Sequence, residues 1–338
     1  MASTLREIGE QGVIERIRRR VRRTSSVVVG IGDDAAVVRP PRGRQLLVAS
    51  DMLVEDVHFQ RRRLAARWVG WKALACNLSD IAAMGGTPLW AVVSLGLPPK
   101  TPVSWVEALY RGLEQCARRF GVAIVGGDTV RASRLIVDVA IVGAARPERV
   151  VRRSGAQVGD WLLVTGRLGG SLRDGRHARV VPRLAEAQEL LRRVRIHAMM
   201  DLSDGLASDL WQLSRASRVA LRVEEARIPV APAARGCRQR GCRCRRWAGL
   251  PAAPAAQAGK MPGRVGRDRP AVYHALMDGE DFELLFTIDP RAASRIPPRI
   301  GACPVTRIGR VVGHGVKVEF ETRDGRVTAL QPEGFRHF

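Results

Sequence analysis

The chain has 338 residues, of which 46% are hydrophobic and 26% are charged. This balance is typical of a folded globular protein and excludes an intrinsically disordered one. No apolar run approaches the roughly 20 residues that a membrane-spanning helix needs, so we expect no membrane segment. The Arg-rich first 23 residues contain glutamates and have no secretory apolar core, which argues against a targeting peptide and predicts a cytoplasmic protein.

The formal net charge of +23 would suit a nucleic-acid-binding protein. Two features weaken that interpretation. Only four of the 56 basic residues are lysines, so the excess is arginine, which a GC-rich coding sequence explains. The charge is also uneven, because residues 235–269 alone hold nine Arg, one Lys and one Asp. We therefore expect a solvated basic surface and no nucleic-acid partner.

The predicted elements alternate between strands and helices along the chain. In the N-terminal half, strands are predicted at residues 27–29, 45–49, 122–125 and 135–142, and helices at 67–84 and 102–120. In the C-terminal half, strands are predicted at residues 161–165, 219–223, 282–288, 306–312 and 316–320, and helices at 182–194 and 199–217. This mixture predicts an α/β (α+β) fold of two domains, residues 1–145 and 146–338.

Residues 235–270 have neither helical nor strand periodicity and are rich in Arg, Cys, Pro and Ala. Three explanations are open at this point: a local reading-frame error, a disordered insertion, or a genuine surface loop. If the segment is an insertion, we expect it to be sensitive to proteases and its removal to leave activity largely intact.

Seven aspartates stand out because each lies at the end of a predicted element: Asp33, Asp34, Asp51, Asp80, Asp128, Asp201 and Asp204. A single aspartate in such a place is ordinarily a turn residue or a helix cap. Several together favour a shared site, because element ends are where α/β proteins assemble sites. Converging carboxylates repel unless cations lie between them, and hard oxygen ligands favour Mg²⁺. Mg²⁺ implies phosphate as the remaining ligand, so the pattern indicates phosphoryl transfer.

The common nucleotide-binding motifs are absent from the sequence. No lysine lies in a Walker loop, and there is no protein-kinase catalytic loop. Residues 30–35 match the dinucleotide pattern G-x-G-x-x-A after a strand. A pyrophosphate would need a helix N-terminus there, but the turn carries two carboxylates, and Pro40 and Pro41 arrive before a helix could form. The sequence therefore argues against a Rossmann site.

Eight short motifs occur in order along nearly the whole chain, apart from residues 235–270. They are Gly30-Ile-Gly-Asp-Asp-Ala, Ser50-Asp-Met-Leu-Val-Glu, Lys72-Ala-Leu-Ala-Cys-Asn-Leu-Ser-Asp, Gly126-Gly-Asp-Thr, Arg153-Ser-Gly-Ala, Asp201-Leu-Ser-Asp-Gly-Leu, Gly279-Glu-Asp-Phe-Glu-Leu and Gly334-Phe-Arg-His-Phe. Together they resemble the thiamine-monophosphate kinase family, of the superfamily that includes aminoimidazole-ribonucleotide synthetase.

The resemblance implies a kinase that phosphorylates thiamine phosphate with ATP as co-substrate and several Mg²⁺ ions. It implies an aminoimidazole-ribonucleotide-synthetase-like fold, in which N-terminal sheets pair across a homodimer and a C-terminal α/β domain closes the cleft. The implied metal ligands are Asp34, Ser50, Asp51, Asp80, Asp128, Asp201 and Asp204, of which Asp51, Asp80, Asp128 and Asp204 are the implied catalytic residues. The implied ATP-binding residues are Gly127, Asp128, Arg153 and Ser203, and those on the thiamine side are His58, Glu280 and Phe335.

The chain departs from the family pattern at Asp56 and Asp278, which stand where Gly is usual and add negative charge near the expected acceptor side. Two alternatives stay open. One is another ATP-using member of the same superfamily. The other is a non-catalytic, basic nucleic-acid-binding protein on this scaffold, which binding that is lost at modest salt and ignores ATP would favour.

Overall fold

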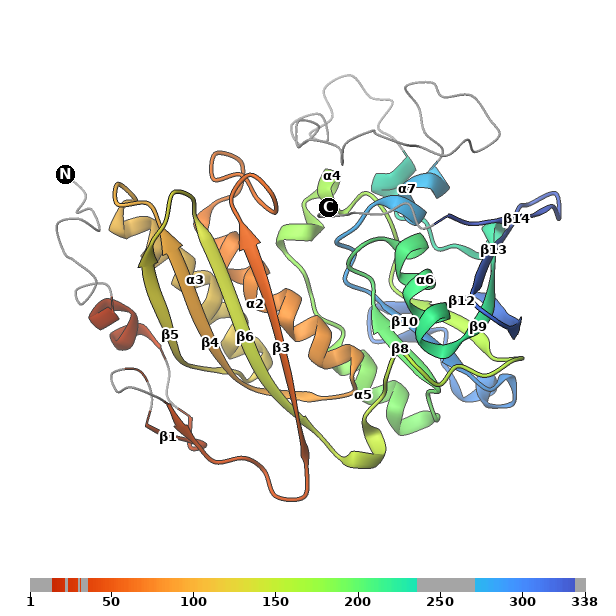
Figure 1. Ribbon diagram of the computed structural model, residues 1–338, viewed down its shortest axis with the longest axis horizontal. Helices are drawn as coiled ribbons and strands as arrows, with labels where there is room; N and C mark the ends of the chain where they lie inside the picture. Colours follow the sequence, from red (N-terminus) through yellow and green to blue (C-terminus); the bar gives the residue numbers. More distant parts are fainter. Residues whose placement is uncertain (1–13, 22–23, 30, 32–35, 236–270, 332–338) are drawn as a thin grey trace. The chain divides into compact units, whose positions relative to one another are not determined.

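The computed structural model describes residues 14–21, 24–29, 31, 36–235 and 271–331 (Figure 1). The chain divides into two compact units. The N-terminal unit comprises Met1–Ile81, Gly86–Val150 and Ala178–Pro182, and the C-terminal unit comprises Ala82–Gly85, Val151–His177 and Arg183–Phe338. The atypical segment 235–270 lies outside the described residues except for its first residue. In the part that is described, no helix is long and apolar enough to cross a membrane.

The N-terminal unit is built on a four-stranded sheet with the order β3-β6-β4-β5. Its elements are β3 (Gln45–Val54), α2 (Ala66–Ala83), β4 (Thr87–Leu97), α3 (Val103–Phe120), β5 (Ala123–Arg131) and β6 (Ile136–Ala145). A separate antiparallel pair is formed by β1 (Val27–Val29) and β2 (Val37–Val38). Strands β4 and β5 pair in parallel, which α3 allows because a parallel pair needs a long crossover connection.

Helices α2 and α3 lie along one face of this sheet (Figure 1). Leu47 of β3 points to that face, because its side chain and that of Ile81 in α2 both lie within 3 Å of where a Cβ at Gly86 would be. The residues that alternate with Leu47 along β3 point to the opposite face. Two of them, Val48 and Met52, are 74% and 51% exposed. We call the side that carries Leu46, Val48, Ser50 and Met52 the open face.

The two helices cross at a pair of glycines. A Cβ added to Gly70 of α2 would lie 2.0 Å from the carbonyl oxygen of Leu109, and one added to Gly112 of α3 would lie 1.8 Å from that of Arg67. Only glycine allows backbones to approach so closely. The crossing helps to explain why α2 is buried on nearly every side, including its polar residues Lys72 and Asn77.

The C-terminal unit contains an eight-stranded sheet with the main order β14-β13-β9-β12-β7-β10-β8. Its strands are β7 (Trp161–Thr165), β8 (Ala198–Asp201), β9 (Val219–Glu224), β10 (Leu284–Ile288), β11 (Arg299–Ile300), β12 (Cys303–His314), β13 (Lys317–Glu321) and β14 (Val327–Ala329). Its helices are α4 (Ser171–Asp174), α5 (Leu184–Arg193), α6 (Leu206–Ser217) and α7 (Ala271–Met277), with the short 3₁₀ turns η2 (Arg176–Ala178) and η6 (Pro290–Arg295).

Helices cover both faces of the C-terminal sheet, whereas α2 and α3 lie along one face of the N-terminal sheet. Leu162 and Val164 of β7 pack in a core cluster with α6 and α7, whereas the intervening Leu163 packs in a second cluster with α5. The sheet therefore lies between two helical layers, and strand alternation supplies one core on each side.

Candidate active site

Two of the predicted site aspartates in the N-terminal unit lie inside strands. Asp51 lies within β3 and Asp128 within β5, whereas the sequence predicted that each strand ends before its aspartate. That prediction was wrong because pairing continues beyond the apolar runs, to Val54 in β3 and to Arg131 in β5. Asp80 does lie in the last turn of α2, as expected.

Ser50 and Asp51 present their side chains to opposite faces of the sheet, because successive strand residues alternate. Ser50 Oγ donates a hydrogen bond of 3.0 Å to Oδ1 of Asp138 in β6, on the open face. Asp51 pairs with the buried Val139 and lies on the face that the helices cover. The two neighbouring ligand candidates therefore point away from each other.

Asp128 belongs to a polar row on the open face. It is opposite Ser94 of β4, which is opposite Asp138, and opposed residues of a sheet share a face. Just before it, Val125 forms a bulge, because Ala91 pairs with Ile124 and Val92 with Gly126. Gly127 has φ +154°, and a Cβ there would lie 1.9 Å from the carbonyl oxygen of Val93. The residue before Asp128 must therefore be glycine.

His58 is fixed from two sides in the turn after β3. Its Nδ1 accepts a hydrogen bond of 3.0 Å from the backbone N–H of Val54. Its carbonyl oxygen accepts one of 3.1 Å from Nζ of Lys72, whose side chain is fully buried on α2. Because Nδ1 is an acceptor, the ring carries its proton on Nε2 and can donate from that side. Nearby Asp56 has φ +66°, a conformation that glycine adopts more readily.

In the C-terminal unit, the motifs around Ser203 and Glu280 are joined by backbone hydrogen bonds. Glu280 N donates to Ser203 O at 2.7 Å, Phe282 N to Leu202 O at 2.8 Å, and Leu202 N to Glu283 O at 2.8 Å. We call these paired segments, residues 201–205 and 279–283, the backbone ladder. It brings an ATP-side candidate and an acceptor-side candidate into direct contact.

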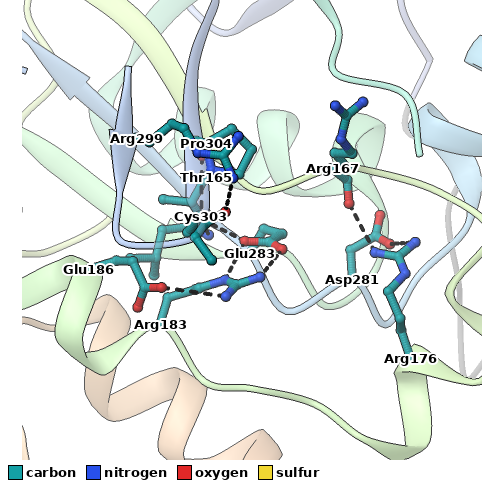
Figure 2. Close-up of polar contacts among 12 residues, drawn as sticks. Thr165, Arg167, Arg176, Arg183, Glu186, Asp281, Glu283, Arg299, Cys303 and Pro304 are labelled. Atoms are coloured by element: carbon teal, nitrogen blue, oxygen red, sulfur yellow. Dashed lines mark hydrogen bonds and ion pairs between the residues drawn. The ribbon is translucent and has the colours of Figure 1, made fainter. Parts of the chain in front are cut away.

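Glu280 and Phe282 both have positive φ angles, +64° and +50°. For a bulky residue this conformation is strained, and such strain persists only where the surroundings impose it. Two buried acidic side chains, Asp281 and Glu283, impose this conformation, one on each side of Phe282. Figure 2 shows Glu283 between Thr165 and Arg183, and Asp281 beside Arg176.

Glu283 accepts hydrogen bonds from Thr165 Oγ1 at 2.8 Å and from Nε and Nη2 of Arg183 at 2.7 and 2.6 Å (Figure 2). Asp281 accepts one of 2.7 Å from the backbone N–H of Gly169, and burial raises the pKa of its carboxyl well above the usual range. These contacts anchor the strained turn that carries Glu280.

Two further residues shape the surroundings of Glu280. The imidazole of His177 is buried, and its Nδ1 lies 3.4 Å from Oε2 of Glu280. Asp278, where the resemblance implies glycine, accepts a hydrogen bond of 2.9 Å from Gly170 N and lies 3.1 Å from Nδ1 of His274. The carboxylate of Asp278 is therefore held by neighbours within this unit.

Arg153 and Asp204 are bridged by one residue of α6. Both contact the side-chain amide of Gln212, Arg153 from Nη1 at 2.8 Å and Asp204 through Oδ2 at 3.1 Å. Asp201, the last residue of β8, is buried. Burial raises the pKa of Asp209 well above the usual carboxyl range, and the charges of Asp204 and Asp201 raise it further.

Among the described residues, no three His, Cys, Asp or Glu side chains could hold a metal ion by themselves. The carboxylates of Asp201 and Asp204 suit Mg²⁺ that arrives with a nucleotide, because such an ion is usually held by one or two carboxylates together with phosphate oxygens and waters. The negative charges of Asp204 and Asp201 contribute to the raised pKa of Asp209, so added positive charge beside them would be favourable.

Three predicted residues, Asp33, Asp34 and Phe335, lie outside the described residues. Sequence reasoning missed Asp138, His177, Asp209 and Gln212. Asp138 could have been found because it is a polar residue within the otherwise apolar strand β6. Asp209 and Gln212 follow the Asp201-Leu-Ser-Asp-Gly motif at helical spacing, which is a usable signal. No sequence signal marks His177, because only the fold places it beside Glu280.

Residues 32–145 match the family described as AIR synthase related protein, N-terminal domain. Over nearly its full length the chain is similar to the thiamine-monophosphate kinase of Rhodopirellula baltica, with 36% identity covering 97% of each chain.

Two solved structures share the fold. The thiamine-monophosphate kinase from Stenotrophomonas maltophilia K279a gives a TM-score of 0.72 at 32% identity, covering 94% of this chain and 96% of that one. AaThiL complexed with AMPPCP and TMP gives 0.69 at 30% identity and covers all of both chains. The expected aminoimidazole-ribonucleotide-synthetase-like fold is thus confirmed, while the pairing of sheets across a dimer stays a prediction.

Proposed function

Because the chain belongs to the thiamine-monophosphate kinase family, we propose that it transfers the γ-phosphoryl group of ATP to thiamine phosphate, giving thiamine diphosphate and ADP. The observation that carries this proposal is the 36% identity, over 97% of the chain, to a relative of that name. A structure that is 30% identical holds AMPPCP together with TMP, which supports a site for two substrates.

The transfer breaks the bond between the γ-phosphorus and the oxygen bridging it to the β-phosphate. It forms a bond to an oxygen of the acceptor phosphate. Since that phosphate is already ionised at neutral pH, no strong general base is needed. The work of the protein is to align donor and acceptor and to offset their negative charge.

We propose that Mg²⁺ is held by aspartate and serine oxygens together with the phosphate oxygens. The proposed ligands are Asp34, Ser50, Asp51, Asp80 and Asp128 in the N-terminal unit and Asp201 and Asp204 in the C-terminal unit. When bound, Mg²⁺ neutralises phosphate charge. The chemistry of this donor set supports Mg²⁺, because oxygen ligands of this kind are those it prefers.

The remaining proposed residues contact the two substrates. Arg153 is suited to a pair of phosphate oxygens, because its planar guanidinium donates two parallel hydrogen bonds. We propose that Gly127, Asp128 and Ser203 also contact ATP. On the acceptor side, the proposed residues are His58, Glu280 and Phe335. A carboxylate such as Glu280 suits thiamine, whose thiazolium ring is permanently cationic, and Phe335 can offer it an aromatic face.

We also propose a homodimer formed through the apolar part of the open face of the N-terminal sheet, around Leu46 and Val48. Exposed apolar side chains gather there, with Leu46 at 49% and Val48 at 74% exposure. Contiguous exposed apolar surface of this kind marks association sites. A cytoplasmic location is proposed with it, since the reaction needs ATP, and Cys116 and Cys303 are free thiols.

The test is an assay of the purified full chain with ATP, Mg²⁺ and thiamine phosphate, in which thiamine diphosphate is separated and quantified. We expect product that depends on both ATP and thiamine phosphate and that is absent when thiamine replaces thiamine phosphate. Folded protein that yields no thiamine diphosphate above a blank would contradict the proposal.

A further inference from the structure

The side-chain amide of Gln212 lies between two residues of the proposed nucleotide side. Its Oε1 accepts a hydrogen bond of 2.8 Å from Nη1 of Arg153. Its Nε2 donates to Oδ2 of Asp204 and to Oδ1 of Asp209, both at 3.1 Å. One neutral amide thus directs its acceptor to a cation and its donors to two carboxyl groups.

Helix α6 carries both this amide and residues that hold its neighbours in place. Asp209 and Gln212 are three residues apart on α6 and share a face. The side chain of Asp209 is fully buried, and its Oδ2 accepts a 3.3 Å hydrogen bond from the backbone N–H of Asp204. At the end of the same helix, Ser217 Oγ donates to the carbonyl oxygen of Arg153 at 2.9 Å. The helix therefore holds Arg153 at both its backbone and its guanidinium.

The chemistry of an amide suits it to this place. If Arg153 and Asp204 were free to meet, their opposite charges would favour an ion pair that occupies both groups with each other. An amide between them gives each group a hydrogen-bonding partner, so that neither needs the other as its partner. We infer that Gln212 is a positioning residue that keeps Arg153 and Asp204 apart and orients both toward the nucleotide. This inference rests on the proposed function, from which the roles of Arg153 and Asp204 come.

The test uses Gln212→Met, which keeps the length of the side chain and its helix propensity but removes both polar contacts. We expect the Kd for ATP in the presence of Mg²⁺, measured by titration calorimetry on the full chain, to rise about tenfold, as for loss of hydrogen bonds to charged groups. The KM for thiamine phosphate should change by less than about twofold, since substrate contacts on that side are retained. The matched control is Gln115→Met on α3, whose exposed amide also accepts hydrogen bonds from an arginine, Arg67; its Kd should equal that of the wild type.

A double-mutant cycle separates positioning from a general structural effect. If Gln212 acts through Arg153, the tenfold effect of Gln212→Met should shrink to about threefold or less in an Arg153→Met background. A full tenfold effect in that background, or equal Kd values for Gln212→Met and wild type, would overturn the inference, as would a wild type that does not bind ATP. If the wild type binds ATP and Mg²⁺ but forms no thiamine diphosphate, the proposed function fails while the Kd ratio still decides the role of Gln212.

Discussion

Among single residues, Asp80 gives the most direct test of the proposed Mg²⁺ ligands. As a proposed Mg²⁺ ligand in the last turn of α2, it should lose its charge but keep its shape in Asp80→Asn. We expect kcat to fall at least about a hundredfold, which corresponds to the ~3 kcal/mol typical of one lost electrostatic contact to a transition state. Steady-state kinetics with thiamine phosphate and ATP measure this. Asp324→Asn, in the exposed turn after β13, is the control; activity of Asp80→Asn within threefold of wild type would remove Asp80 from the site.

The buried carboxyl group of Asp281 should make the free energy of unfolding depend on pH. Because burial raises the pKa of this carboxyl well above its usual range, the folded protein binds its proton more tightly than the unfolded chain does. The free energy of unfolding should therefore fall as pH rises from the ordinary carboxyl range toward the raised pKa, by about 1.4 kcal/mol for each unit of the shift. In Asp281→Asn the group is neutral at every pH, so the fall in melting temperature between about pH 5.5 and 8 should be smaller.

Glu319→Gln is the control for that experiment. A hydrogen bond from Lys317 and another from Arg222 lower the pKa of Glu319, so its stabilising contribution is lost only in more acidic solution. The change in melting temperature over the neutral range should match that of the wild type. Equal pH profiles for Asp281→Asn and wild type would show that Asp281 is ionised in the folded protein.

Residues in contiguous motifs could be named from the sequence, whereas those joined only by the fold could not. Ser203 and Asp204 stand in one short run, and Glu280 follows a glycine in another. Gln212 contacts Arg153 across 59 positions of the chain, and no local pattern encodes such a contact. A local motif identifies the polar residues, but tertiary packing determines which of them come into contact.

At the scale of elements, the crossing of α2 and α3 is the feature most sensitive to a single methyl group. In Gly112→Ala the new Cβ would lie 1.8 Å from the carbonyl oxygen of Arg67, so the helices must separate. We expect the free energy of unfolding, measured by denaturant titration, to fall by at least about 2 kcal/mol, although alanine has the higher helix propensity.

Gly313→Ala is the matched control, because a Cβ there meets nothing within 4 Å. Its stability should stay within about 0.5 kcal/mol of the wild type, as for other surface substitutions. A stabilised Gly112→Ala variant would mean that the helices do not approach as closely as described.

The strands that the sequence missed are short or interrupted. Strand β4 contains Pro88, which favours a chain break over a central strand, and the structure accommodates it where the register with β6 shifts between Pro88 and Trp90. Strand β8 is only four residues long, and so short an apolar run cannot be told from the first turn of a helix. The long helices α2 and α3 were predicted to within one residue because their ends carry glycine signals.

At the scale of the whole molecule, the open face predicts the oligomeric state. We expect light scattering to give twice the chain mass of 37.0 kDa for the wild type and the single mass for Val48→Lys, because a charge cannot be buried unpaired in an apolar interface. Val48 is 74% exposed in the single chain, so the substitution should leave the monomer folded. Val316→Lys, at another exposed valine, should stay dimeric; a dimeric Val48→Lys variant would place the interface elsewhere.

The backbone ladder has a consequence for how this chain can vary in evolution. Ser203 and Glu280 are held in register by hydrogen bonds on both sides, from Glu280 N to Ser203 O and from Leu202 N to Glu283 O. A residue inserted or deleted in either segment would break that register and turn each following side chain away from its present direction. Among related chains we therefore expect insertions and deletions to be excluded from residues 201–205 and 279–283, even where the individual side chains there are exchanged.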